Sequence, residues 1–284
     1  MPSSFSAITQ STAGAPRYAN YPAPPGLGDK AGEPSIGVNW KTERTFSNSM
    51  FSIPNGGTAM YYGGFLTYAL KVTFDDGPSP ANATWEKKQL PTASAPRALG
   101  DPILFTDHST GRTFISQLIG GTPLGSTTDI TDDDGSTFMP SEGSGLPSNV
   151  DHQTFGGGPY HAPAPPGAGV LGYQNAVYYC SQSVADADCS ISLDGGRVFG
   201  PAIPMFTISD CDGLHGHIKV GADGTAYVPN KGCGGAAPLV LGNEQASIVV
   251  SEDNALTWKI RPIPHPTTTG HENDNLTRGD DDPS

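Results

Sequence analysis

The feature that most constrains this chain is a short motif that recurs at a fixed period. Its copies are "TDDDGSTF" (131–138), "SLDGGRVF" (192–199) and "SEDNALTW" (251–258). Each has Ser or Thr first, Asp third, and Phe or Trp last, and the copies lie about 60 residues apart. A weaker copy, "TFDDG" followed by "ATW", lies one period upstream. Self-similarity at such a period predicts one supersecondary unit stacked on repeats of itself.

Each period contains four short segments in which apolar and polar residues alternate, bounded by Gly, Pro, Asn and Asp. This pattern predicts four strands per unit. The fold class predicted is therefore all-β, a β-propeller of four-stranded antiparallel blades. The blades are expected at about residues 33–95, 100–148, 150–210 and 213–264. In the first blade the second strand is expected at "RTFSNSMF" (44–51), and in the last blade the first strand is expected to begin at His215.

Composition narrows the class of protein further. Gly and Pro number 37 and 27, which suits a chain rich in turns, and residues 1–32 are read as an extended Pro/Gly/Ser-rich arm. A net charge of −13 argues against a nucleic-acid partner. No apolar run approaches the length of a membrane span. The first ten residues lack the basic start and apolar core of a signal peptide, so a secretory signal is expected to be missing from this chain.

The four cysteines form two close pairs, Cys180 with Cys189 and Cys211 with Cys233. No CxxC spacing is present, so zinc and thioredoxin-like sites are poorly supported. An even count at hairpin distances favours two local disulfides and an extracellular location, and the alternative is four reduced cysteines in strands.

The recurring motif resembles the Asp-box, or BNR repeat, of the sialidase superfamily. The resemblance covers about residue 33 to the end, and "DPILFTDHSTGRTF", "DHQTFGGGP" and "LHGHIKVGADGTAYVPNKGCGG" are also similar to bacterial secreted sialidase-like proteins. In that family the Asp accepts backbone hydrogen bonds within a turn, the Gly adopts a positive φ, and the aromatic packs between blades. The resemblance implies structural roles for Asp133, Gly135, Phe138, Asp194, Gly196, Phe199, Asp253 and Trp258. Asp132 and Asp134 are expected to be solvated, and Ala255, where Gly is usual, is expected to distort the third turn.

The face opposite these turns is where the resemblance places a ligand site. The first residues of the inner strands are polar and are expected to surround a channel there. We take Asp101, Asp151 and His152 as candidate catalytic residues, and Glu33, His215, His217, Asn230 and Lys231 as candidate ligand-binding residues. Carboxylates and imidazoles can act as acids, bases or metal ligands, or can simply cap strand ends. His215 and His217 alternate in the predicted strand, so both side chains are expected to point the same way; no particular metal or cofactor is predicted.

Sialic acid release in the family needs three arginines, a Tyr–Glu pair and an acid Asp. Here Arg44, Arg112 and Arg197 are expected on the Asp-box face, and Glu33-Pro-Ser stands where the family has "RIP". No Tyr–Glu pair can be assigned. Two functions therefore stay open: a secreted glycoside hydrolase acting on extracellular glycans, and a non-catalytic propeller that binds a glycan or a protein.

Two further segments bear on architecture. "DDDPS" (280–284) matches the opening of another inner strand, which predicts a longer propeller cut off here, the alternative being four-bladed closure with a terminal segment as latch. The Pro- and aromatic-rich segment 156–174 is expected to extend the Asp-box face, as a packing insertion or a carbohydrate platform.

Overall fold

The computed structural model describes residues 20–27, 32–39, 58–64, 68–75, 82–91, 98–119, 125–141, 151–183, 186–233 and 245–263. The regular elements within these ranges are β-strands. No helix in the described ranges is long and apolar enough to cross a membrane.

The strands form four antiparallel sheets, each built from consecutive segments of the chain. The first sheet contains β1 (Gly32–Val38), β2 (Thr58–Gly64), β3 (Tyr68–Asp75) and β4 (Asn82–Gln89). The second contains β5 (Ala98–Thr106), β6 (Thr113–Ile119), β7 (Gly125–Thr131) and β8 (Met139–Pro140). The third contains β9 (Asp151–Gly158), β10 (Ala176–Gln182), β11 (Asp186–Ser192) and β12 (Ile203–Thr207). The fourth contains β13 (Cys211–His215), β15 (Ala226–Cys233), β16 (Gln245–Ser251) and β17 (Lys259–Pro262), with β14 (Lys219–Val220) beside β15.

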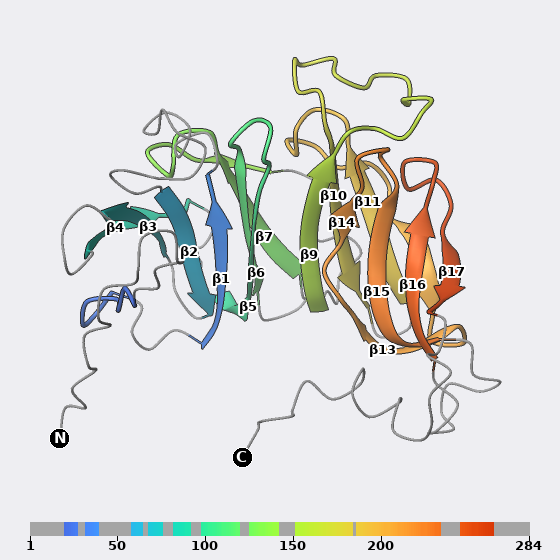
Figure 1. Cartoon of the computed structure of the whole chain (residues 1–284), viewed down its shortest axis with the longest axis horizontal. Coiled ribbons are helices and arrows are strands. Elements are labelled where there is room, and N and C mark those ends of the chain that lie inside the picture. Colours follow the sequence, from blue (N-terminus) through green and yellow to red (C-terminus); the bar gives the residue numbers. More distant parts are fainter. Residues whose placement is uncertain are drawn as a thin grey trace, which may run out of the picture.

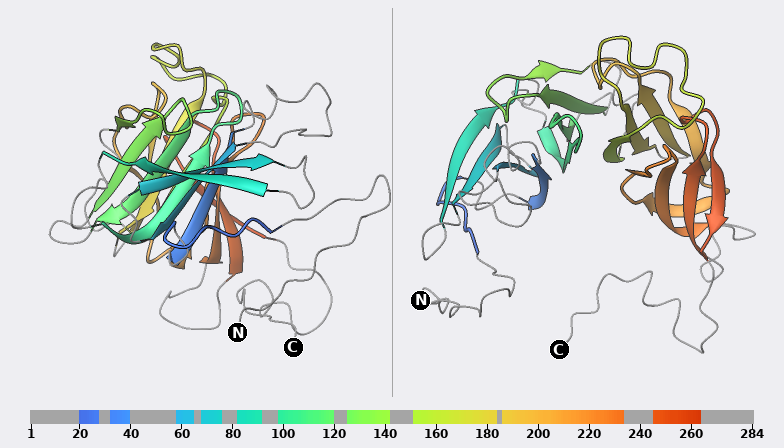
Figure 2. Two further views of the ribbon diagram at one scale, coloured as in Figure 1. Left: turned by 90° about the vertical axis from the view of Figure 1, so that its left-hand side faces the viewer. Right: turned by 45° about the horizontal axis from the view of Figure 1, so that its top comes forward.

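The prediction of an all-β chain with four-stranded antiparallel units is therefore confirmed. The sheets follow one another in chain order along an arc, with the first and fourth sheets at its two ends (Figures 1 and 2). The first strands of successive sheets pack together: β1 contacts β5, and β5 contacts β9. Closure of the arc, and the number of units in it, stay predictions.

Two predicted strand positions are wrong. The partner of β1 is β2 at Thr58–Gly64 rather than residues 44–51, which lie outside the described residues. The first strand of the fourth sheet begins at Cys211 and ends at His215, where the chain leaves the strand before resuming as β14. The backbone N–H of Gly216 donates to the Pro229 carbonyl at 2.7 Å, and a Cβ at this position would lie 2.7 Å from the Pro229 ring. This close crossing interrupts the alternation that the sequence pattern assumed.

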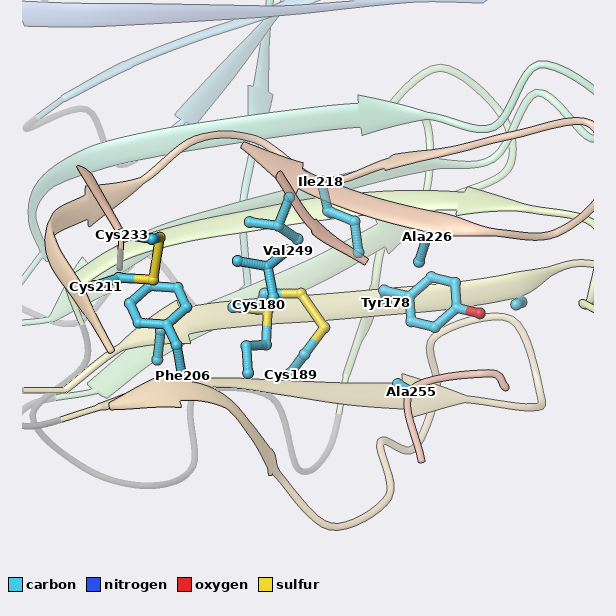
Figure 3. Close-up of a cluster of buried hydrophobic side chains, with 14 residues drawn as sticks. Tyr178, Cys180, Cys189, Phe206, Cys211, Ile218, Ala226, Cys233, Val249 and Ala255 are labelled. Atoms are coloured by element: carbon cyan, nitrogen blue, oxygen red, sulfur yellow. A yellow bond between two sulfur atoms is a disulfide. The ribbon is translucent and has the colours of Figure 1, made fainter. Parts of the chain in front are cut away.

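Apolar side chains fill the spaces between neighbouring sheets. Phe105, Phe114, Phe155, Tyr179 and Phe199 join the second sheet to the third through stacked and edge-on ring contacts. A larger cluster joins the third sheet to the fourth and contains both disulfides (Figure 3). Cys180 bonds Cys189 across β10 and β11, and Cys211 bonds Cys233 across β13 and β15. The predicted cysteine pairing is present.

Glycines in β9 allow the innermost strands of the third and fourth sheets to approach closely. A Cβ on Gly156 would lie 2.8 Å from the carbonyl oxygen of Ile218, and one on Gly158 would lie 2.8 Å from the Val220 side chain. Real Cβ atoms do not occupy such short contacts, so larger residues here would separate the strands. Gly156 and Gly158 thus set the spacing of the seam between these two sheets.

The three motif turns share one hydrogen-bond pattern. In the first, the Thr131 hydroxyl donates to Asp133 Oδ1 at 3.0 Å and accepts from the Gly135 N–H at 2.8 Å, while Asp133 Oδ1 accepts from the Thr137 N–H at 2.8 Å. The same bonds recur from Ser192 and Asp194, and from Ser251 and Asp253. Hydrogen bonds to Thr137 and Thr131 lower the pKa of Asp133 despite the opposing effect of burial.

Two expectations about these turns are wrong. Ala255 does not distort its turn: it adopts a φ of 65° and donates to the Ser251 hydroxyl at 2.9 Å, as Gly135 and Gly196 do with their own Thr or Ser. Asp132 and Asp134 are not merely solvated. Asp132 accepts two bonds from Arg112, and Asp134 accepts one from the Asn39 amide at 2.6 Å.

The segment 159–175, between β9 and β10, is fastened to the turns on both sides of it. At one end Tyr173 and Asn175 donate to the buried Asp107 carboxylate, and the Tyr173 ring lies 4.9 Å from the Arg112 guanidinium. At the other end the His161 N–H donates to Asn254 Oδ1 at 2.9 Å and the Asn254 amide donates back to the His161 carbonyl at 2.9 Å. The segment 159–175 extends from the same end of the sheets as the motif turns (Figure 1). We call this end of the molecule the turn face.

Candidate functional site

Three predicted site residues meet in the seam between the third and fourth sheets. The ring centroids of His152 and His215 lie 5.5 Å apart, and those of His152 and His217 lie 6.1 Å apart. His152 comes from β9, whereas His215 ends β13 and His217 follows it. We call these three residues the histidine cluster. Residues about 60 positions apart in the sequence are thus joined by the packing of two sheets.

An irregularity in β9 places His152. Cys180 pairs with Thr154 and Gln182 pairs with Asp151, so β9 has one more residue than β10 across this step. His152 also has a φ of 49°, the left-handed region that residues with a Cβ seldom adopt. A β-bulge of this kind redirects a side chain, and strained backbone is concentrated at functional sites. Its Nδ1 is buried and has no hydrogen-bond partner among the described residues.

His215 is held in a single tautomer. Its Nδ1 lies 2.9 Å from the Gly216 carbonyl oxygen, which can only accept, so Nδ1 carries the proton and the Nε2 of the neutral ring holds a lone pair. The side chain is 1% exposed, and Nε2 has no partner within the described residues. Burial, with a contribution from His152 and His217, lowers the pKa of His215 to about 4. The ring is therefore neutral near pH 7 and offers one buried acceptor.

Asn230 lies opposite His215 in the register of β13 and β15. Its Oδ1 accepts from the Gly232 N–H at 2.8 Å, which fixes the orientation of the amide. The amide nitrogen is consequently a donor, and it is buried with no partner in the described part of the chain. A free acceptor and a free donor thus belong to two residues that face each other across one strand pair.

The expectation that His215 and His217 share one strand face is wrong. The strand ends at His215, and His217 is exposed while His215 is buried. Burial and the neighbouring His152 and Lys219 lower the pKa of His217. His217 nevertheless contributes to the cluster through His152, so the three rings form a chain with His152 at its centre.

Asp151 is the predicted carboxylate whose side chain the structure describes. Asp151 is exposed and its Oδ1 accepts from the adjacent His152 N–H at 2.8 Å, the strand-end capping that was the alternative prediction. The side chains of Glu33, Asp101 and Lys231 lie outside what the structure describes, so their proposed roles stay predictions.

Two residues of the third sheet were not singled out from the sequence. Gln182 Oε1 accepts from the His215 N–H at 3.3 Å and so links β10 to the cluster. Asp188, on β11, is 6% exposed, and burial together with nearby Asp186 raises its pKa to about 6. The alternation "DAD" in an otherwise apolar strand was the available signal for Asp188, whereas nothing in the sequence marks Gln182.

Among the side chains that the structure describes, the arrangement offers imidazole nitrogens and hydrogen-bonding groups. No three His, Cys, Asp or Glu residues of the described part are already arranged to hold a metal ion. Buried polar atoms without partners cost about 1–3 kcal/mol each, and His152 Nδ1, His215 Nε2 and the Asn230 amide nitrogen are among those in the described residues. The cluster is suited to binding a polar ligand in the seam.

No family model matches the chain, and no curated protein matches it. Among solved structures, the "Dos1 propeller" is 9% identical with a TM-score of 0.42, over 76% of this chain and 47% of that one. A xylan beta-1,4-xylosidase from Bacillus halodurans is 12% identical with a TM-score of 0.42, over 84% and 43%. Trypanosoma rangeli sialidase bound to the inhibitor DANA is 10% identical with a TM-score of 0.39, over 76% and 35%. The chain spans less than half of each of these proteins. Because the scores are low, function is inferred below from the site's own residues.

Proposed function

We propose that this chain is a sialidase-like Asp-box β-propeller, or part of one, that binds extracellular carbohydrate at the histidine cluster. The recurring motif and the arc of four-stranded sheets support the propeller. The two disulfides support an oxidising, extracellular compartment.

The observation that carries the binding function is that His215 and Asn230 lie opposite each other in the register of β13 and β15, and each has one buried polar atom, His215 Nε2 and the Asn230 amide nitrogen. One is an acceptor and the other a donor, both are buried, and neither has a partner among the described residues. A sugar hydroxyl both donates and accepts, so an acceptor and a donor on two opposite residues of one strand pair are suited to it. Nucleic acid is a poor partner because the chain carries a net charge of −13.

The test is a glycan microarray, probed with the full chain in the presence of EDTA, followed by titration of any glycan that binds. We expect Asn230→Asp, which keeps the acceptor for Gly232 but removes the donor, to weaken binding at least tenfold. His217→Ala, at an exposed position, is the second variant in case Asn230→Asp fails to fold. His108→Ala, at an exposed position on the turn face, is the matched control. Absence of any glycan binding, or binding that only the control weakens, would overturn the proposal.

Glycoside hydrolysis is a second candidate, favoured by Asp188. A buried carboxyl with a pKa near 6 is the kind of group that donates a proton to a leaving oxygen. The corresponding test is release of 4-methylumbelliferone from a panel of its glycosides, with Asp188→Asn expected to abolish any activity. Activity that survives this substitution would exclude Asp188 as the acid.

A further inference from the structure

The turn face exposes large apolar side chains to solvent. The described residues include six exposed large hydrophobic side chains, and four of them lie on this face. They are Val170 (71% exposed) and Leu171 (61%) of segment 159–175, Val198 (52%) of the second motif copy and Leu256 (68%) of the third. Exposed apolar side chains that gather on one face and are surrounded by polar residues are typical of a contact surface for another molecule.

The motif copies show that Val198 is not required by the turn itself. In the first copy the Thr137 hydroxyl donates to Asp133 Oδ2 at 2.7 Å, and Thr257 donates to Asp253 in the same way in the third. Val198 stands at the equivalent position of the second copy and has no hydroxyl, so this turn lacks the bond. Valine here loses a hydrogen bond and places apolar surface in water. A role in binding accounts for it, whereas a role in folding does not.

Segment 159–175 is held ready for contact by its neighbours. A Cβ on Gly167 would lie 3.7 Å from Leu193 Cδ1 and 4.0 Å from Val170 Cγ2, so this part of the segment lies beside the second motif turn. Asn254 of the third turn bonds the segment at His161. A segment that is fixed at both ends loses little conformational entropy when a partner binds, which favours affinity.

The charge on the turn face indicates which kind of partner is suited to it. Arg112 pairs with Asp132, and Lys259 pairs with Glu252. The other described charges in the motif turns and in the turn before β15 are mostly negative: five carboxylates, Asp133, Asp134, Asp194, Asp223 and Asp253, against one guanidinium, Arg197. A second copy of the chain or an anionic membrane surface would bring like charges together. A protein surface with basic side chains around an apolar centre is complementary.

We propose that the turn face around segment 159–175 binds a protein partner whose contact surface combines apolar side chains with a rim of Lys and Arg. Val170 and Leu171 are the central contacts, and Val198 and Leu256 flank them. The surrounding carboxylates fix orientation and speed association. This inference does not depend on carbohydrate binding, which is proposed for the histidine cluster.

The probe that tests it is a phage library of random peptides, selected on the immobilised full chain. We expect enriched peptides to combine Leu, Phe or Trp with Lys or Arg, and calorimetry with the synthesised peptide gives its affinity. The affinity should fall at least tenfold in Val170→Ser/Leu171→Ser, and should weaken as salt is added. Val198→Thr restores the residue of the other two copies. It should therefore weaken peptide binding while raising the urea midpoint of unfolding, which a merely structural role for Val198 does not predict.

Ile208→Ser is the matched control, because Ile208 is 46% exposed and follows β12 at the end of the third sheet opposite the turn face. It should bind the peptide as the parent chain does. The proposal is overturned if no peptide is enriched, if the enriched peptides are acidic, or if the turn-face variants leave the affinity unchanged. Light scattering that shows a dimer of the parent chain, lost in Val170→Ser/Leu171→Ser, would also overturn it, because the turn face would then bind a second copy.

Discussion

Arg112 and Asp132 form a bidentate ion pair, with Nε 2.7 Å from Oδ1 and Nη2 2.7 Å from Oδ2. The third nitrogen of the same guanidinium donates to the Gly195 carbonyl at 2.8 Å. Asp132 belongs to the motif turn of the second sheet and Gly195 to that of the third. One side chain therefore ties two neighbouring repeats together on the turn face, and Tyr173 of the long segment packs on it.

The first prediction concerns this tie. Arg112→Lys keeps the charge but loses the planar fork, so it should lower the free energy of unfolding by about 1–2 kcal/mol. Urea unfolding monitored by circular dichroism measures the change. Lys259→Ala is the matched control, since the Lys259–Glu252 pair is half exposed on both sides and should contribute less than about 0.5 kcal/mol. Equal effects of the two substitutions would contradict the assigned role of Arg112.

The second prediction compares two glycines of the motif. Gly135 and Gly196 have φ of 78° and 83°, so Ala introduces similar backbone strain at both. A Cβ on Gly135 would lie 2.9 Å from Lys88 Cγ and 3.1 Å from the Phe138 ring, whereas one on Gly196 would collide more severely with the fully buried Phe114 ring. Gly135→Ala should cost about 1 kcal/mol and Gly196→Ala about 3 kcal/mol or more. Thermal and urea unfolding test the order, and the reverse order would be incompatible with the packing described here.

The third prediction separates turn structure from binding. Asp133→Ala removes the acceptor for the Thr137 N–H and hydroxyl, and should lower stability by about 1–2 kcal/mol. Glycan binding at the histidine cluster should be unchanged, because Asp133 lies on the turn face. Glu252→Ala, at an exposed position of the third turn, is the control and should alter neither property. An unchanged melting temperature in Asp133→Ala would refute the structural role.

The fourth prediction is a pH dependence. The pKa of His215 is about 4 in the folded chain and about 6.5 in an unfolded one. Between about pH 4 and pH 6.5 the unfolded state binds more protons than the folded state, so the free energy of unfolding rises with pH. The contribution of neutral His215 to stability is fully present above about pH 6.5 and is lost as the pH falls toward about 4. The loss attributable to His215 approaches about 3 kcal/mol near pH 4. His217 contributes in the same direction.

The check is urea unfolding at a series of pH values for the parent chain and for His215→Asn. The variant should show a shallower decline between pH 6.5 and about 4, whereas His108→Ala should follow the parent. Superimposable profiles for the parent and His215→Asn would mean that His215 titrates normally in the folded chain.

The repeat explains why so much of the fold could be predicted from the sequence. Strand alternation and the Ser/Thr-x-Asp turn are local, so each copy carries the information for its own hairpin. The prediction failed for the second strand of the first sheet, where "RTFSNSMF" and "TAMYYGG" both alternate and only pairing with β1 distinguishes them. It also failed at Gly216, where a contact with Pro229 ends the strand.

The site was harder to predict because it depends on irregular backbone and on distant pairs. His152, His215 and His217 were chosen for their positions at strand starts, yet His215 ends its strand and a bulge orients His152. A bulge adds one residue to one strand, and alternation alone cannot locate it. The bond from Arg112 to Gly195 joins residues 83 positions apart, and no local pattern contains such information.

The glycines of β9 have a consequence for the curvature of the whole molecule. With no side chains at Gly156 and Gly158, the third sheet is thinner along its inner strand, where it meets Ile218 and Val220, than farther out. A sheet of that form acts as a wedge, and the angle of the wedge determines how far the chain turns from one sheet to the next. The bend of the arc at this seam is therefore encoded in two residues of β9 that lack side chains, Gly156 and Gly158.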